Sequence, residues 1–566
     1  MLETAECYGL FTRLLGITLA FQIATSGYQL IPLIGRSGVE PISYLIAAYR
    51  RDLGTFRGFL KLPSLFWISS DDWMIRFLTI LGTLLGIGLF FGLLGEYNPI
   101  AFFICWAIWL TFVNSNSNVF GIPWDLLLVE AGFLAIFLPG NESIQNLALM
   151  SSPHPLVHFS ILFLNFRVMF GMGLNKFKVI DHRTRDGSFV YHFLEWQPFG
   201  TKESLYLHNV PMAVHRILLA GLFVSEVVMP WAMFIGPEGR MAFAVSTILL
   251  QFGIYACGNF GIFNIMPIIL AIPFFANAPL LVLPDLGVLS VVMALHIAGS
   301  LPYAFILNSW NQGMWTYVPQ RIRSYAPLIA PVASFYRLIA PFRLWCAYGI
   351  FTPRHNYPKL LPVIQMSQNG MDWIDVQPKY VRYQPKEIAW HWAPYHPRLD
   401  HFFYYTHFRK SDFKVSCLSG LNPYYIHAIG FIDKLVEHLY RGTPQVQTLF
   451  ESVPFEQPKF IRLGTYGFKL NSVKNLNITG AYWSKELMGV TAPLERIELE
   501  PSTGIHDAYH PFICDTLELD DEGCASYEIN DERVRLQRSP LRTSLSNEDS
   551  EEVRLYKDPN HEFGGV

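Results

Sequence analysis

Two carboxylates lie within one apolar segment of this chain, at Asp125 and Glu130, directly after Trp124. A separation of five positions places the two side chains about 140° apart around a helix, at 100° per residue. A charge at membrane depth costs several kcal/mol unless it is paired. Two interpretations remain open: the carboxylates line a polar interior and do chemistry there, or they pair with arginines and hold helices together.

Two cations in a later apolar segment are the natural counterparts of these acids. Arg167 and Lys176 lie on either side of a glycine-rich stretch, and Arg167 is the expected partner of Asp125 or Glu130. A desolvated lysine can act as a base, whereas a lysine at a membrane boundary simply extends its charge into water. The sequence favours the boundary interpretation for Lys176. If the protein is an enzyme, these four residues are its catalytic candidates.

Asn259 and Asn264 open a further apolar segment. Their side-chain amides either cap a helix or bind a polar group, and capping is the favoured interpretation. Together with Trp124 and the four charged residues they form the polar motif expected in the membrane. The histidines have no metal-ligand spacing, and no phosphate loop, nucleophile elbow or dinucleotide fingerprint is present. The sequence therefore predicts no metal site and no cofactor.

A polar, aromatic block lies in the second half of the chain, from Pro394 to Phe403. Within it, Asp400 is predicted to cap a helix and Arg398 to form a buried ion pair. A structural junction is the favoured role of this block. The alternative is that Tyr395, His396, Arg398 and Asp400 bind a client protein.

The elements around these residues are those of a polytopic membrane protein. Residues 241–320 hold one charged residue, Asp285, and residues 77–124 hold only Glu96. Such stretches must be solvated by lipid or by other apolar helices. About eight or nine apolar segments are expected, near 8–34, 74–95, 99–114, 122–139, 155–174, 212–236, 241–258, 260–283 and 286–307. The third and fourth are short, and glycines such as Gly82 and Gly86 favour close helix packing.

The second half of the chain has the pattern of a mixed, β-rich soluble domain. An Asn-Gly turn at 369–370 predicts a hairpin, and 460–470 predicts a further strand. Residues 422–441 have helical spacing, with a proline near the start and Gly442 at the stop. The predicted domains are a transmembrane domain at 1–310, a junction at 311–343, a soluble domain at 344–500 and an acidic, disordered tail at 501–566.

The overall charge limits the possible partners, and the cysteines and sequons bear on the modifications that the chain could carry. Net charge is −3, so no nucleic-acid partner is expected, whereas contact with membrane lipid is. Cys417, Cys514 and Cys524 permit a disulfide if their domain faces an oxidising lumen. Two sequons, at Asn141 and Asn477, permit glycosylation in the same case.

These blocks, in their order, resemble the lipase maturation factor family. The matching pieces are 124–133, 166–176, 191–198, 259–264, 347–351, 367–373, 383–385, 394–400, 454–455 and 462–468. The membrane half is also similar to the horizontally transferred transmembrane domain of vitamin K-dependent γ-carboxylase, in which a lysine in a place comparable to Lys176 takes part in catalysis.

The resemblance implies a membrane-embedded folding factor that helps secreted lipases to become active in the endoplasmic reticulum. Its partner would be a client lipase or another secreted protein, engaged by the C-terminal domain. Such a factor is a multi-pass protein of the endoplasmic reticulum membrane, or of the inner membrane if the source is bacterial. The alternative is an intramembrane enzyme of the γ-carboxylase-like fold, acting on a lipid, quinone or protein. An enzyme requires the polar residues to converge on a pocket.

Overall fold

The protein, seen here as a computed structural model, divides into two compact units. One contains Met1–Tyr357 and Ala389–Arg398, and the other Pro358–Ile388 and Leu399–Val566. We call them the helical unit and the sheet unit, and we call Ala389–Arg398 the inserted segment. The structure describes residues 2–178, 182–282, 287–305, 335–336, 338–348, 359–405, 423–490, 494–498, 524–529 and 532–538.

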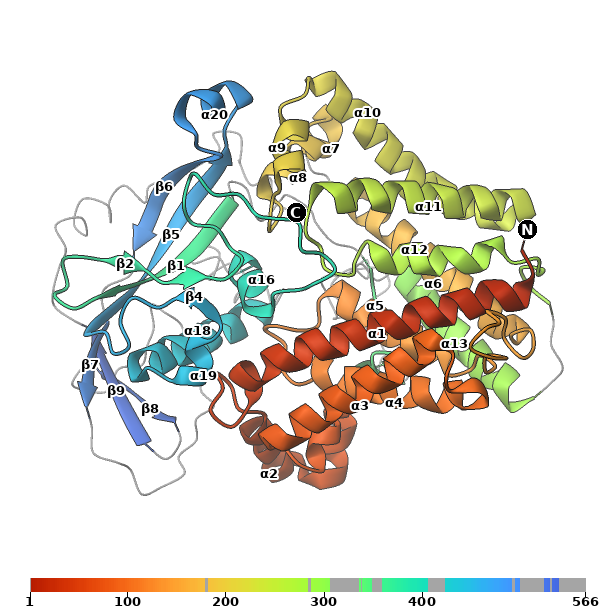
Figure 1. Ribbon diagram of the computed structural model, residues 1–566, viewed down its shortest axis with the longest axis horizontal. Helices are drawn as coiled ribbons and strands as arrows, with labels where there is room; N and C mark the ends of the chain where they lie inside the picture. Colours follow the sequence, from red (N-terminus) through yellow and green to blue (C-terminus); the bar gives the residue numbers. More distant parts are fainter. Residues whose placement is uncertain are drawn as a thin grey trace, which may run out of the picture. The chain divides into compact units, whose positions relative to one another are not determined.

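The helical unit is built mainly from helices (Figure 1). Its longer helices are α1 (Thr4–Ile34), α2 (Ile42–Lys61), α3 (Asp72–Phe91), α4 (Asn98–Val113), α5 (Pro123–Ala135), α6 (Pro155–Lys178), α10 (Met212–Phe223), α11 (Pro237–Cys257) and α13 (Val288–Phe305). Its shorter ones include α7 (His182–Asp186), α8 (Phe189–Trp196), α9 (Lys202–His208), α12 (Ile265–Ala271) and the π-helical turn η3 (Val224–Val228).

Six helical stretches among the described residues are long and apolar enough to cross a membrane. They are Thr4–Ile34, Asp72–Phe91, Gly95–Val113, Pro155–Leu174, Met212–Phe234 and Pro237–Cys257. The other three predicted segments are also helical but shorter, in α5, α12 and α13. With 13 residues, α5 is about 20 Å long, less than the roughly 30 Å of a bilayer core. The prediction of a helical membrane part is confirmed.

Glycines bring α1 and α3 together, side by side (Figure 1). A Cβ on Gly86 would lie 2.7 Å from the backbone oxygen of Gly16, and one on Gly82 would lie 2.9 Å from Ile23. The contact at Gly86 is with backbone, so a side chain there would push the two helices apart, whereas the end of the Ile23 side chain could shift to admit one at Gly82. The close packing predicted from the glycine spacing is confirmed.

The sheet unit contains a seven-stranded sheet in the order β2-β1-β5-β7-β9-β8, with β6 also paired to β5. Its strands are β1 (Lys359–Ser367), β2 (Ile374–Asp375), β5 (Phe460–Leu470), β6 (Trp483–Val490), β7 (Leu494–Glu498), β8 (Cys524–Ile529) and β9 (Glu532–Arg538). A separate two-stranded sheet joins β3 (Gln377–Pro378) to β4 (Phe450–Ser452). The helices are α16 (Arg398–Tyr405), α18 (Pro423–Arg441), α19 (Pro444–Gln447) and α20 (Val473–Thr479).

The local predictions for this unit are confirmed. β1 and β2 form an antiparallel hairpin in which Gln365 lies opposite Asp375, and Gly370 in the turn has φ 75°. β1 is buried along its whole length. Leu435 and Leu439 of α18 are fully buried, as expected for one face of the helix predicted at 422–441.

The domain boundaries differ from the prediction in two places. The inserted segment groups with the helical unit, although the sequence analysis placed it in the soluble domain. Strands β8 and β9 lie within 501–566, so this region is not disordered throughout. Most of the junction, the end of the chain and the side chains of Cys417, Cys514 and Cys524 lie outside the described residues.

Candidate functional site

The two carboxylates of α5 are buried completely, and each has a different cationic partner. Asp125 and Glu130 are both 0% exposed. Asp125 pairs with Arg398 of the inserted segment, and Glu130 pairs with Arg167 of α6. From the sequence, Arg167 was the expected partner of either acid, and in the structure it pairs with Glu130. The two acids therefore belong to two separate polar clusters.

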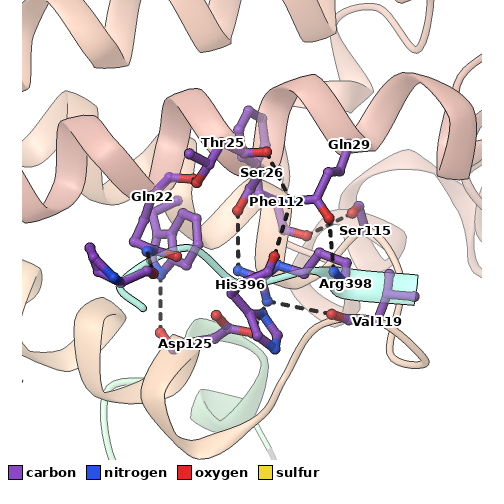
Figure 2. A network of polar contacts seen from close by, with 12 residues as sticks. Gln22, Thr25, Ser26, Gln29, Phe112, Ser115, Val119, Asp125, His396 and Arg398 are labelled. Carbon is purple, nitrogen blue, oxygen red and sulfur yellow. Dashed lines mark hydrogen bonds and ion pairs between the residues drawn. The ribbon is translucent and has the colours of Figure 1, made fainter. Parts of the chain in front are cut away.

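The Asp125–Arg398 pair is the centre of the first cluster (Figure 2). Arg398 Nη1 lies 2.6 Å from Asp125 Oδ2, and Arg398 Nη2 donates to Ser26 Oγ of α1 at 3.1 Å. The guanidinium also lies 4.1 Å from the centre of the Phe120 ring. Arg398 is 1% exposed, which confirms the prediction that it forms a buried ion pair.

The backbone of the inserted segment is bound by side chains of the helical unit. Gln29 of α1 accepts from Arg398 N at 2.8 Å and donates to His396 O at 3.0 Å. Asn259 Oδ1 accepts from Trp392 N at 2.7 Å and from Ala393 N at 3.1 Å. Since buried backbone groups need partners, the side-chain amides of Gln29 and Asn259 form a binding site for the backbone of the inserted segment, which we call its seat.

Further contacts complete this seat. Gln22 donates to Pro394 O at 3.2 Å, and the Tyr255 hydroxyl donates to Ala393 O at 2.8 Å. The buried ring of His396 packs edge-on against Trp124, with 5.2 Å between ring centres. Sequence reasoning missed the glutamines of α1, although a glutamine inside an apolar span is the signal that marks them.

Asp400 has a different environment, within the sheet unit. Its Oδ1 accepts from the backbone of Tyr380 at 2.7 Å and of Val381 at 2.9 Å. The prediction that it caps a helix is wrong, because it lies inside α16 and its carboxylate is used by a distant loop. Burial raises the pKa of Asp400 to about 6, although both backbone donors favour the charged form.

Burial argues against direct client contact by most of the predicted binding residues. His396, Arg398 and Asp400 are each at most 3% exposed, and Tyr395 is half-buried. Their side chains or backbones serve contacts inside the protein. A client surface must therefore be sought elsewhere.

The second cluster surrounds Glu130. Besides the ion pair with Arg167, Glu130 Oε2 accepts from the Tyr348 hydroxyl at 2.7 Å. His296 Nε2 lies 3.7 Å from Glu130 Oε1, and Arg167 Nη1 donates to Cys346 O at 3.3 Å. Tyr348 and His296 were not predicted, because each lies far from Glu130 in the sequence.

Lys176 forms a third cluster, with Glu226 of η3. Lys176 Nζ lies 2.5 Å and 2.6 Å from the two carboxylate oxygens, and the glutamate is 0% exposed. Lys176 is 6% exposed, so the prediction of a boundary lysine with its charge in water is wrong. Glu226 was missed, although it is the one carboxylate in the apolar run 217–235.

The two asparagines bind polar groups rather than cap a helix. Asn259 binds the inserted segment, and Asn264 Nδ2 donates to Gln251 Oε1 at 2.8 Å. Asn264 does lie at the N-terminus of α12, but its side chain makes no capping hydrogen bond. The capping prediction is therefore wrong for both.

At least two grooves are present on the described part of the helical unit. The first is lined by α6, α7, α10 and the first residue of η3, and the second by η3 and α11. Neither is lined by Asp125, Glu130, Arg167 or Lys176. Within the described ranges, no three His, Cys, Asp or Glu side chains lie close enough to hold a metal ion. The arrangement is that of three closed ion pairs, which can fix helices and the inserted segment in place.

Comparisons with known proteins identify both parts of the chain. Residues 8–281 match the lipase maturation factor transmembrane domain, and residues 344–493 match the lipase maturation factor C-terminal domain. Human lipase maturation factor 1 is 24% identical over 498 residues, which cover 83% of this chain and 84% of the human protein. The mouse protein is 25% identical, over 82% of this chain and 83% of its own length.

A second group of relatives matches a smaller part. Human lipase maturation factor 2 is 27% identical over 276 residues, which cover 45% of this chain and 38% of the human protein. No solved structure matches. Because a transmembrane domain and a C-terminal domain of one family match in order over most of the sequence, this membrane protein belongs to the lipase maturation factor family.

Proposed function

We propose that this protein is a membrane-embedded maturation factor that helps secreted lipases to fold into their active form in the endoplasmic reticulum. The observation that carries the proposal is the match of both family domains, together with alignment to lipase maturation factor 1 over more than four fifths of the chain. The helical unit anchors the protein in the membrane, and the sheet unit engages the client.

The geometry of the buried charges supports a scaffold. An enzyme would direct some of these groups into a pocket open to a substrate. Here Asp125 and Glu130 are completely buried and paired. Removing one member of a buried pair is costly, whereas keeping both holds a unique arrangement. The pairs thus serve to fix the membrane helices and the inserted segment.

The hairpin of the sheet unit is the client surface that we favour. Met371, directly after the turn, is 79% exposed, and Ile374, at the start of β2, is 49% exposed. Together they place two exposed apolar side chains close together in the chain, where a client could contact them. Met371 and Ile374 are therefore our candidates for contact with a partly folded lipase, in place of the residues of the inserted segment and Asp400.

One observation favours the alternative, an intramembrane enzyme. Lys176 and Glu226 form a buried lysine–carboxylate pair, and such pairs can transfer protons. Its neighbours Phe177 and Val224 line the first groove, which would give a substrate access. In this case Lys176 would be the base, and its loss would abolish function without loss of the fold.

The experiment is rescue of lipase activity in cells that lack their own lipase maturation factor. Secreted lipoprotein lipase is assayed for activity and for mass, with this chain verified as expressed and in the membrane. We expect the ratio of activity to mass to rise, and the double variant Met371→Glu/Ile374→Glu to reduce it. A matched control, Lys474→Glu on exposed α20, should have no effect. Loss of rescue in the charge-free variant Lys176→Met/Glu226→Leu, with normal protein levels, would favour the enzyme instead.

A further inference from the structure

The first groove of the helical unit has a polar end and an apolar end. It encloses about 530 Å³, within the range of small-molecule sites. Arg185, Asp186 and Arg216 line one part of it, and Leu219, Phe223 and Val224 line the other. No part of the polar clusters described above contributes to it.

The positions of these residues place the polar end at a membrane boundary. Phe177 comes three residues after the span that ends at Leu174, and Arg216 comes four residues after the next span begins at Met212. The end of one span and the start of the next lie on the same side of a bilayer. Four helical residues advance about 6 Å, a depth from which an arginine reaches the headgroup region.

The apolar end of the groove lies deeper in the hydrocarbon. Phe223 is seven residues beyond Arg216, or about 10 Å along α10. The ring of Phe177 packs edge-on against Phe223, with 4.9 Å between their centres, and Leu219 is buried against the core below. The span that contains α10 is only 22% buried inside the protein, so the groove faces lipid.

The charge of the polar end is positive and available. Two arginines against one aspartate give a net charge of +1 (2 − 1). Asp186 is held by the backbone of Ser188, whose N–H donates to it at 2.8 Å. Among the described residues, neither Arg185 nor Arg216 has a hydrogen bond or an ion pair. A Cβ on Gly187 would lie 2.6 Å from Arg216 Cγ, so the glycine makes room for the stem of this arginine.

We propose that this groove binds an anionic glycerophospholipid. The phosphate and acidic headgroup lie between Arg185 and Arg216, and an acyl chain lies along Leu219, Phe223 and Val224. Basic pockets between transmembrane helices recognise anionic headgroups in this way, and the groove joins that charge to an apolar wall open to the bilayer. The proposal does not depend on the identity of the client.

The test uses the purified full-length protein in detergent and native mass spectrometry. A short-chain phosphatidylserine is titrated, and phosphatidylcholine with the same chains serves as the uncharged comparison. We expect phosphatidylserine to bind more tightly. The variant Arg185→Gln/Arg216→Gln should bind it roughly 30-fold more weakly, since each arginine near the surface contributes roughly fivefold. Binding of phosphatidylcholine should not change.

A matched control removes two other exposed arginines. Arg57→Gln/Arg76→Gln makes the same change in charge, and Arg76 also lies four residues inside a span, the one that begins at Asp72. This variant should bind phosphatidylserine like the wild type. A second variant, Ala220→Trp, fills the apolar end and leaves both arginines in place. It should weaken the binding of both lipids.

Three results would overturn the proposal. They are equal affinity of the wild type for the two lipids, an equal loss in the control variant, or full competition by millimolar inorganic phosphate. The first would show that the groove does not recognise headgroup charge, the second would reduce the effect to general surface charge, and the third would make the groove a site for free anions. Variants that elute as aggregates are replaced by Arg216→Gln alone, for which a roughly fivefold loss is expected.

Discussion

Removal of Arg398 should release the inserted segment from the helical unit. The substitution Arg398→Ala leaves the completely buried Asp125 carboxylate without its 2.6 Å ionic partner. Breaking a buried pair on one side costs roughly 3–5 kcal/mol, because an uncompensated charge remains. We expect the contacts between the inserted segment and the helical unit to break, because the Asp125 carboxylate can be solvated by water only if the segment moves away.

Hydrogen exchange at the inserted segment measures this release. The amides of Trp392, Ala393 and Arg398 are bonded to side chains of the helical unit, so they exchange only when the segment opens. A loss of 3–5 kcal/mol corresponds to exchange that is faster by roughly 100-fold to 4,000-fold. Peptides that cover 389–398 report the change by mass spectrometry.

Two control variants separate charge from packing. Asp125→Leu/Arg398→Met removes both charges, and its exchange should stay within roughly tenfold of the wild type, since apolar replacement of a buried pair is often nearly neutral. Arg382→Ala breaks the more exposed pair with Glu451 and should leave the segment unchanged. Equal exchange in the single and double variants of the buried pair would refute the reasoning.

Three further predictions concern other groups. Lys176→Met should destabilise the protein in a thermal unfolding assay far more than Lys176→Met/Glu226→Leu, because only the single variant leaves a buried charge; equal losses would contradict this. The pKa of Asp400 is raised in the folded state, so its contribution to stability is full below pH 4 and is lost as pH rises through about 6. Asp400→Asn should therefore gain about 2 kcal/mol of unfolding free energy relative to the wild type between pH 4 and pH 7 in denaturant unfolding, and a constant difference would exclude the shift. Asn477 is exposed on α20 whereas Asn141 is 0% exposed, so in cells only Asn477→Gln should remove a glycan that is visible as a mobility shift; loss of a glycan in Asn141→Gln would be the opposite result.

Local signals predicted much of the fold because they act over a few residues. The Asn-Gly turn fixed the hairpin of β1 and β2, and the strand at 460–470 was predicted at its observed bounds. Long apolar runs likewise marked each of the six candidate membrane spans among the described residues. The extent of the tail was wrong, because the pairing of β8 with β9 and of β9 with β7 outweighs an acidic, polar composition.

The partners in the polar clusters required the tertiary structure. The sequence around Arg398 predicts that it forms an ion pair, but it does not identify the partner, because Asp125 is 273 positions away. Lys176 was expected at the boundary because Glu226 lies on another helix. Asp400 was expected to cap its own helix, yet its Oδ1 accepts hydrogen bonds from two backbone N–H groups of the loop that contains Tyr380 and Val381. Sequence shows which residues need partners, whereas the fold decides which partner each one finds.

The specific activity of a secreted lipase tests the central claim most directly. Lipoprotein lipase is expressed in cells whose only lipase maturation factor is this chain, and activity per unit of secreted lipase mass is compared with that of cells without any. The account predicts a clear rise in activity per unit mass. An unchanged ratio, with the chain present at normal levels in the endoplasmic reticulum membrane, would contradict it.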